Sequence, residues 1–295
     1  MTDDWEPPEP DMDAEFTYQW NADWDEDKPL LKITKSSLNT FKWCNKQYEF
    51  SYLDKRPQDS SLAMLKGSTV HRMHESFYRE VDMEGIEDLS KAEIADRFRT
   101  QFPVDDYGET YDGIIAYEAD RCYDSPELFL PVGNEAVLWA KWEVNQLINV
   151  KFILNRNYTV QLNGHIDRIF LENGGYVLME LKTGLWKDSK TSGMRQEMAF
   201  YKLLMENASD ENLIEYGLDP NIPITHWGWF YPDSNYHYVE ECKPASQTAL
   251  KKSFAKLIKS YENENFPASY FYKKCVHCSY MGICDAAIEN QLVDW

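Results

Sequence analysis

A β-hairpin is predicted over residues 160–182, and its pattern constrains the fold more than any other stretch of the chain. Val160, Leu162 and Ile166 alternate with polar residues, as they would in a strand with one buried face. The run Asn173-Gly174-Gly175 supplies the positive φ angles of a tight turn, and a second strand-like run follows it. The two strands are therefore expected to pair antiparallel.

Three charged residues stand out in this hairpin, within GHIDRIFLENGGYVLMELKTG at residues 164–184. Asp167 is expected on the polar face of the first strand, while Glu180 and Lys182 are two residues apart and share a face of the second. Antiparallel pairing can place Asp167 across from Glu180, within reach of one metal ion. By spacing alone, a solvated trio of surface charges is an equally good interpretation.

The chemistry of these side chains suits phosphodiester hydrolysis. Mg²⁺ and Mn²⁺ prefer oxygen ligands, usually one or two carboxylates with water and phosphate oxygens completing the shell. Asp167 and Glu180 supply that number of carboxylates. Lys182 can hold or help deprotonate the attacking water and can offset charge on the scissile phosphate.

The pattern of Asp167, a short hairpin and then Glu180-x-Lys182 resembles the signature of the PD-(D/E)xK nucleases. The resemblance implies that Asp167, Glu180 and Lys182 are catalytic. It also implies that Asp167, Glu180 and the backbone carbonyl of Leu181 bind Mg²⁺ or Mn²⁺.

Upstream, KGSTVHRMHESF at residues 66–77 is predicted to be a helix that starts at Gly67 and Ser68. It resembles the Gly-x-x-x-His element of RecB-type nucleases, which implies that His71 is a further metal ligand. His74 lies on the same predicted helix, and a histidine on a helix is more often structural.

Downstream, MRQEMAFYKLL at residues 194–204 is predicted to be a helix. It resembles the Gln-x-x-x-Tyr element of the same nucleases, which contacts DNA and steadies the catalytic lysine, and this implies DNA-binding roles for Gln196 and Tyr201, with Arg195 beside them. Gln196 and Tyr201 are five residues apart, so either Glu197 replaces the glutamine or Phe200 replaces the tyrosine. A plain amphipathic helix is the alternative.

The cysteines indicate a second metal site. Three of the six lie in CVHCSYMGIC, with Cys275, Cys278 and Cys284 at metal-site spacing. No signal peptide or long apolar run is evident, so we expect a cytoplasmic protein, in the host cytoplasm if viral, with reduced thiols and no membrane association. A tetrahedral site needs a fourth ligand, and the candidates are Cys44, Cys122, Cys242 and His277.

The segment SSLNTFKWCNKQYEFSYLDKR around Cys44 resembles the opening of RecB-type nucleases that carry an iron-sulfur cluster. In those proteins one early cysteine joins three late ones. The resemblance implies a [4Fe-4S] cluster bound by Cys44, Cys275, Cys278 and Cys284. Zinc also binds four thiolates.

The net charge of −20 argues against a general nucleic-acid binder, but the charge is uneven. Residues 1–28 hold 11 acidic residues and one lysine, a net −10, and are predicted to be a disordered acidic tail. Residues 28–79 hold ten Lys or Arg against four Asp or Glu, and residues 243–274 hold seven against two. These basic stretches flank the proposed cluster cysteines and are expected to form a positive surface for a phosphate backbone.

The predicted fold class is α/β, and the resemblance implies a restriction-endonuclease-like core with a central mixed sheet flanked by helices. We predict helices at 36–54, 68–80, 194–206 and 245–262, and strands at 150–155 and near THWGWFYP. KAEIADRFRTQF and NEAVLWAKWEVNQLI are assigned to a mostly helical acidic segment. The predicted organisation is an acidic tail at 1–28, N-terminal helices at 29–80, the acidic helical segment at 81–149, the nuclease core at 150–242, and a C-terminal helix with the cysteine cluster at 243–295.

The resemblance is closest to the CRISPR-associated RecB-like exonucleases, followed by the AddB nuclease domain and viral relatives. It implies a metal-dependent DNA exonuclease acting on single-stranded ends, together with CRISPR-adaptation or replication and recombination proteins. Two alternatives stay open: a non-catalytic nuclease-fold subunit that binds DNA or assists assembly, with a structural metal cluster, and a zinc protein that recognises protein partners.

Overall fold

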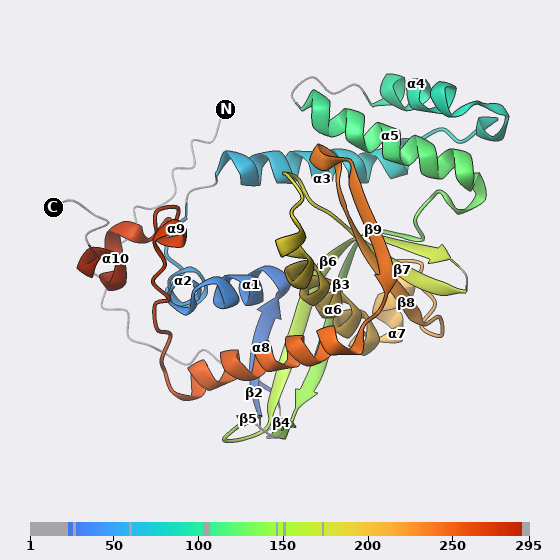
Figure 1. The fold of residues 1–295 in the computed structure, drawn as a ribbon. Coiled ribbons are helices and arrows are strands. Elements are labelled where there is room, and N and C mark those ends of the chain that lie inside the picture. Colours follow the sequence, from blue (N-terminus) through green and yellow to red (C-terminus); the bar gives the residue numbers. More distant parts are fainter. Residues whose placement is uncertain are drawn as a thin grey trace, which may run out of the picture.

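The computed structural model describes residues 23–25, 28–58, 61–102, 107–145, 147–149, 152–172 and 174–290 (Figure 1). Most of the predicted acidic tail lies outside these residues. Asp23–Asp25 within it form strand β1, so the prediction of disorder is wrong at this point. Within the described part of the chain, no helix has the length and apolar character needed to cross a membrane.

A seven-stranded mixed sheet forms the centre of the molecule, in the order β1-β2-β6-β7-β8-β9, with β3 paired to β6 outside this path. The pairs β2-β6 and β7-β8 are parallel, and the other pairs in the sheet are antiparallel. The bounds after β1 are β2 Lys28–Thr34, β3 Gly133–Val144, β6 Tyr158–Glu172, β7 Gly175–Leu181, β8 Ile224–Tyr231 and β9 Tyr236–Glu241. Two short strands, β4 Leu147–Asn149 and β5 Phe152–Ile153, pair separately.

The long strand β6 has different partners along one edge. β2 pairs with residues 159–163 of β6, and β7 pairs with residues 168–172. Because β2 runs parallel and β7 antiparallel to β6, the C-terminal ends of these two strands point toward each other. A notch is left between them at residues 164–167, and we call this place the β6 notch.

One face of the sheet is covered by α1 (Lys35–Trp43), α6 (Thr191–Asn207) and α8 (Pro244–Glu262) (Figure 1). Their apolar residues join those of the sheet in the larger core, where Trp227, Trp229 and Phe254 are completely buried. The short helix α7 (Asp210–Glu215) follows α6.

The second face of the sheet packs against α3 (Leu62–Glu80), α4 (Lys91–Gln101) and α5 (Gly108–Asp124), which lie together in Figure 1. Phe77, Phe98 and Phe129 form the aromatic centre of this smaller core. The two cores hold the sheet between two helical layers, so the predicted fold class is confirmed.

The C-terminal segment returns to the first helices. α9 (Tyr272–Cys275) and α10 (Asp285–Glu289) lie near α2 (Asn45–Tyr48) (Figure 1). The Tyr280 hydroxyl donates to the backbone oxygen of Arg56, and Lys274 Nζ donates to that of Trp43. A π-helical turn spans Glu49–Leu53, and 3₁₀ turns span Ile86–Asp88, Pro126–Leu128, Asp188–Lys190, Pro232–Ser234 and Met281–Ile283.

Two secondary-structure predictions and one domain boundary need correction. Residues 133–144, assigned to the acidic helical segment at 81–149, form β3, because buried Ala136, Leu138 and Ala140 alternate with exposed residues in the period of a strand. Of the predicted strand at 150–155, the described residues form a strand at Phe152–Ile153, which lies outside the main sheet. The predicted core at 150–242 therefore omits β2 and β3.

Two helix boundaries also differ. α3 begins at Leu62 rather than at Gly67 and Ser68, because the Ser61 side chain accepts a hydrogen bond from the Met64 N–H and caps the helix. The predicted helix at 36–54 is interrupted at Cys44, whose extended backbone separates α1 from α2.

We predict that Gly228→Ala in β8 lowers the free energy of unfolding by about 1–3 kcal/mol. A Cβ at this position would lie 2.4 Å from the backbone oxygen of Tyr238 and 2.6 Å from the Met179 sulfur. The matched control is Gly193→Ala in α6, where a Cβ meets no atom within 4 Å and helix propensity favours alanine. Urea unfolding measures both, and equal losses would contradict the packing argument.

Candidate active site and metal centre

Two carboxylates lie at the β6 notch. Asp167 is in the notch itself, and Glu180 is near the C-terminal end of β7, where continuing the β6-β7 register places it across from Asp167. Their residues are only 7% and 1% exposed, so they are not part of a solvated surface trio. The Leu181 N–H donates to Asp167 Oδ2 at 2.7 Å, which fixes this carboxylate against β7.

Lysines from both strand ends neutralise Glu180. Lys182 Nζ donates to Glu180 Oε1 at 2.6 Å from just beyond β7, and Lys35 Nζ pairs with the same oxygen from just beyond β2. Although burial opposes ionisation, Lys182 and then Lys35 lower the pKa of Glu180 well below its ordinary value. Glu180 Oε2 is buried and has no hydrogen-bond partner among the described residues, which leaves a carboxylate oxygen for a cation.

Asp167 is in the opposite electrostatic state. Burial, followed by the charge of Glu180, raises the pKa of Asp167 to about 6, against the opposing effects of His71 and Lys35. The metal-free site thus contains one ionised carboxylate and one that accepts a proton readily. A divalent cation would relieve the repulsion between them.

His71 faces this pair from α3. Its Nδ1 lies 3.5 Å from Asp167 Oδ1 and 3.7 Å from Glu135 Oε1. Burial alone would lower the pKa of His71, but Asp167, Glu135 and Glu180 together raise it. Potential ligand atoms of His71, Glu135 and Asp167 all lie within 4.8 Å of one another, as donors to one metal ion would.

Glu135 was not predicted from the sequence. It lies on β3 with a positive φ of 50°, which is a strained conformation for a residue other than glycine. The neighbouring strand is also irregular here, because Ile166 and Ile169 both belong to the larger core although strict alternation would put them on opposite faces. The change in facing occurs around Asp167 and accompanies the approach of Glu135 to His71.

A buried charge network lies next to the site and holds α3 in place. His74 Nδ1 lies 2.7 Å from an Arg168 guanidinium nitrogen, and His74 Nε2 lies 2.9 Å from Glu118 Oε1. Burial, reinforced by Arg168, lowers the pKa of His74 to about 4, so its ring is neutral at neutral pH and bridges the two charges. His74 therefore has structural contacts, while His71, one turn earlier, faces the carboxylates.

Helix α6 supplies Glu197 and Tyr201 to the site. Glu197 Oε2 lies 3.0 Å from Lys182 Nζ and 3.7 Å from Lys35 Nζ, and Lys35 Nζ also lies 4.6 Å from the centre of the Tyr201 ring. Glu197 and Tyr201 are four residues apart, so of the two substitutions allowed by the sequence, Glu197 in place of the glutamine fits the geometry.

The other predicted residues of α6 have different surroundings. Arg195 forms a two-point ion pair with Glu240 of β9, with contacts of 2.6 and 2.7 Å. Neither Arg195 nor Gln196 lines the cleft beside the carboxylates, whereas Tyr201 does. DNA contacts by Arg195 and Gln196 thus stay predictions without support from the geometry of the site.

An open cleft of about 990 Å³ contains the site. Its lining includes Asp167, Glu180, Lys182 and His71 together with the first half of α3 and the outer face of β3 and β6. Asp167 and Glu180 have little solvent exposure, but both border this cleft, which is large enough to admit part of a polymeric substrate.

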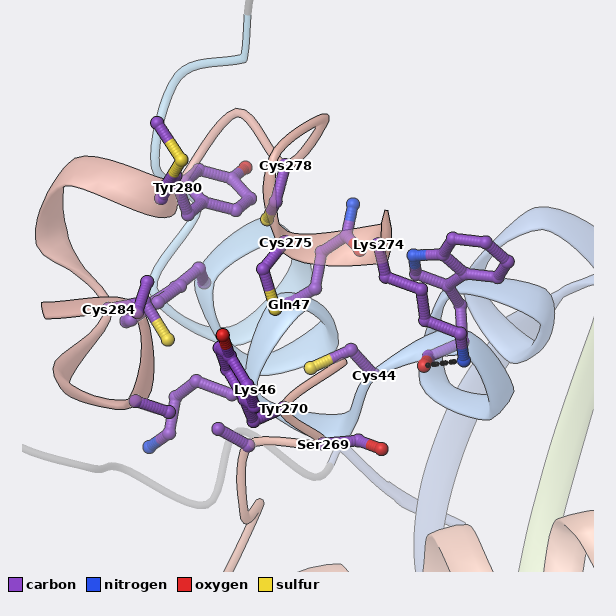
Figure 2. Close-up of a pocket in the computed structure, with 16 residues that line it drawn as sticks. Cys44, Lys46, Gln47, Ser269, Tyr270, Lys274, Cys275, Cys278, Tyr280 and Cys284 are labelled. Atoms are coloured by element: carbon purple, nitrogen blue, oxygen red, sulfur yellow. Dashed lines mark hydrogen bonds between the residues drawn. The ribbon is translucent and has the colours of Figure 1, made fainter. Parts of the chain in front are cut away.

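The four predicted cluster cysteines meet in a separate pocket (Figure 2). Cys44 approaches from the end of α1, and Cys275, Cys278 and Cys284 approach from the C-terminal segment (Figure 2). Burial raises the pKa of the Cys278 thiol against the opposing effect of the Tyr280 backbone N–H, and Cys44, Cys284 and Cys275 each add to the rise, so each of the three lies near Cys278. Cys122 is buried in α5 and Cys242 follows β9, and neither lines this pocket.

The sequence matches the family model of the PD-(D/E)XK nuclease superfamily over residues 32–285. The chain belongs to this superfamily. The positions of Asp167, Glu180, Lys182 and the four pocket cysteines fall within the matched range.

The superfamily members usually use divalent metals, and the group of His71, Glu135 and Asp167 is a candidate site for one.

No curated protein matches this sequence. Among solved structures, SSO0001 is similar over 87% of each chain, with 13% identity and a TM-score of 0.41. A candidate exonuclease from Eubacterium rectale is similar over 90% of each chain, with 12% identity and a TM-score of 0.40.

We predict that Mn²⁺ affinity rises from about pH 5, through the pKa of Asp167 near 6, and levels only above the raised pKa of His71. Asp167, whose pKa is raised to about 6, must lose its proton to bind the ion, and His71, whose pKa is also raised, must be neutral. Calorimetric titration of the metal-free protein across this range tests the expectation. An affinity that does not change with pH would contradict the assignment of these two groups as ligands.

Proposed function

We propose that the protein is a metal-dependent DNA exonuclease that hydrolyses phosphodiester bonds at single-stranded ends. The observation that carries the proposal is the convergence of Asp167, Glu180, Lys182 and His71 on one notch that opens into a large cleft. Two carboxylates, an imidazole and an ammonium at this spacing suit the binding of a cation and a phosphate together.

The residues present fit a hard divalent cation. Asp167 and Glu180 offer carboxylate oxygens, His71 offers a ring nitrogen, and Glu135 adds a third carboxylate near Asp167 and His71. The predicted Leu181 carbonyl is adjacent in sequence to Glu180, and its role as a ligand stays a prediction. When bound, Mg²⁺ or Mn²⁺ would lower the pKa of coordinated water and polarise the phosphate.

Lys182 acts as a fixed cation in this proposal. Although burial opposes its charge, Glu180 and then Glu197 raise the pKa of Lys182 well above its ordinary value. An ammonium with such a pKa donates hydrogen bonds at neutral pH but does not accept a proton. Lys182 therefore orients the attacking water and stabilises the phosphate, while Glu197 and Glu180 hold its Nζ in position.

Lys35 has a related role from the other strand end. It contacts Glu180, Glu197 and the face of the Tyr201 ring, so it offsets the buried carboxylates from the side of β2. We infer that Lys35 is a positioning residue that keeps Glu180 ionised and oriented.

The preference for single-stranded ends, and the proposed work with replication, recombination or CRISPR-adaptation proteins, come from the resemblance to RecB-like exonucleases. Labelled oligonucleotides that are single-stranded, duplex or circular would test the substrate preference directly, with Mn²⁺ or Mg²⁺ added. Binding of DNA without cleavage under these conditions would instead favour a non-catalytic DNA-binding subunit.

Asp167→Asn and Lys182→Ala are each expected to lower the cleavage rate at least a hundredfold, because each removes a group used at the scissile phosphate. Lys187→Ala, an exposed lysine five residues further on, is the control and should cleave at the wild-type rate.

Asp167→Asn should also raise the melting temperature of the metal-free protein. The folded-state pKa of Asp167 is raised, so its ionisation opposes folding above about pH 6. Lost cleavage together with a lowered melting temperature would mean that the variant damages the fold, and near-wild-type cleavage would refute the assignment.

We further propose that Cys44, Cys275, Cys278 and Cys284 bind one [4Fe-4S] cluster. The fit is supported by the meeting of four thiols in one pocket (Figure 2). Zinc also binds four thiolates, so the choice of [4Fe-4S] rests on the resemblance around Cys44, and metal analysis distinguishes the two.

The proposed role of the cluster is to join the two ends of the described chain. Three ligands lie within ten residues, and the fourth is more than 230 residues away, so a shared cluster closes a loop around the whole core. Closing such a loop reduces the entropy of the unfolded chain, with a stabilisation of about several kcal/mol if a cross-link model applies.

Cys44→Ser is expected to contain less iron and sulfide and to melt at a lower temperature than the wild-type protein. Cys242→Ser, whose sulfur lies outside the pocket, is the control and should keep both properties. Anaerobic purification followed by iron, sulfide and zinc analysis makes the measurement. Stoichiometric zinc without sulfide, or an undiminished cluster in Cys44→Ser, would exclude this ligand set.

A further inference from the structure

The outer face of three paired strands leads away from the β6 notch. In β2, β6 and β3, residues that are direct partners across the strands project from the same face. Starting next to Asp167, the first row is His165 with Val137, the second is Thr34, Asn163 and Trp139, and the third is Lys32, Gln161 and Lys141. We call these three rows the ladder face.

The ladder face is opposite to the face that packs in the larger core. Leu138 and Ala140 on β3 are each 1% exposed, whereas Val137 and Trp139 are 44% and 48% exposed. The first two rows are continuous with the catalytic site, because their residues on β3 and β6 line the same cleft as Asp167 and Glu180.

Trp139 is the largest apolar side chain of the ladder face, and its backbone is fixed. Its N–H donates to Asn212 Oδ1 at 3.0 Å, and the indole is half exposed in the cleft. A half-exposed tryptophan on a rigid strand within a substrate cleft has the geometry of a stacking platform, since its flat face stays available to an aromatic ring.

Strand geometry gives the distance from this platform to the site. Successive rows are two residues apart, which is about 6.6–6.8 Å along a strand, so Trp139 is about 13 Å from the row of Asp167 and Glu135. An extended single strand of DNA advances by a similar length for each nucleotide. A scissile phosphate at Asp167 would then bring the base two nucleotides away over Trp139.

The charges on and next to the ladder face also suit an extended single strand of DNA. Exposed Lys32 and Lys141 lie in the row beyond Trp139, where the next phosphate would pass. Glu143 follows on β3, where its carboxylate accepts a hydrogen bond from Thr159, so the positive charge does not extend past the row of Lys32 and Lys141. His165 lies between Trp139 and the carboxylates.

We propose that Trp139 is a nucleotide-binding subsite that stacks on an unpaired base two nucleotides from the scissile phosphate. The inference rests on the proposed DNA nuclease function and specifies its substrate as a single strand that is extended over the ladder face. Inside a duplex, both faces of each base are already stacked on the neighbouring base pairs and cannot meet the indole.

The test is a binding cycle between protein and substrate that does not require cleavage. The wild-type protein and Trp139→Ala are titrated without added divalent cation against fluorescent single-stranded octanucleotides, each with one abasic position, moved along the strand. At one position, loss of the base should weaken binding to the wild-type protein on the order of tenfold. Loss of the base at the same position should weaken binding to Trp139→Ala by less than about twofold.

Two variants separate stacking from other effects. Trp139→Phe keeps a flat ring and should recover most of the affinity. Tyr123→Ala removes an aromatic residue of similar exposure on α5, outside the cleft, and should show the full wild-type dependence on the base.

The inference is overturned if the abasic positions affect the wild-type protein and Trp139→Ala equally, or if Trp139→Ala weakens binding of a blunt duplex as much as that of the single strand. Cleavage of the same octanucleotide by the wild-type protein with Mn²⁺ is measured separately. Absence of cleavage would refute the proposed nuclease function, while the binding cycle would still decide whether Trp139 contacts a base.

Discussion

The repulsion between two buried carboxylates, Asp167 and Glu180, is the constraint around which the centre of this molecule is built. Ionised groups with so little exposure are costly unless cations compensate them. The compensation comes from Lys35 and Lys182, which follow the ends of two strands that point at each other along one edge of β6. The position of each lysine therefore depends on the length of the strand before it. If β2 or β7 were longer, Lys35 or Lys182 would lie beyond Glu180 and could not neutralise it.

A second buried charge network, on the side of the sheet that faces α3 and α5, supports the charged groups at Asp167 and Glu180. Arg168 follows Asp167 directly on β6, and its guanidinium contacts His74 and Glu118 on two helices of the opposite layer. Although burial opposes ionisation of Glu118, Arg121 and then His74 and Arg168 lower its pKa to about 2. This network ties α3 and α5 to the strand that carries Asp167, so the height of His71 over the carboxylates is set by contacts one helical turn away.

Local patterns in the sequence predicted the hairpin, but the resemblance to the nuclease signature was needed to favour a site at Asp167, Glu180 and Lys182 over a solvated trio of surface charges. The spacing of the late cysteines and the resemblance around Cys44 also predicted which four thiols meet. In each case the signal lies in a short segment with a distinct periodicity or residue type. The predicted single polar face of β6 was only partly right, because α3 covers the sheet at Asp167 and buries it.

The site residues that were not predicted lie far from the hairpin in the sequence, and only the tertiary fold brings them to the carboxylates. Lys35 and Glu135 lie on two elements distant in the sequence from the hairpin, and neither belongs to a motif that marks it. Glu135 was missed for two reasons. Its strand was assigned to a helical segment, and its positive φ interrupts the alternation of buried and exposed residues that is typical of a strand. The choice between Glu197 and Gln196 likewise needed the orientation of α6 relative to the lysines, which the sequence of one helix does not contain.

Helix α1 connects the two proposed metal sites as a short rigid strut. Its first residue is Lys35, which contacts Glu180, and its C-terminal cap is Cys44, whose N–H bonds to the Thr40 oxygen. Nine helical residues span about 13 Å and resist compression along their axis. A displacement of Cys44 along the helix axis would therefore be transmitted toward Lys35, so that binding of the proposed cluster could alter the charge balance at Glu180.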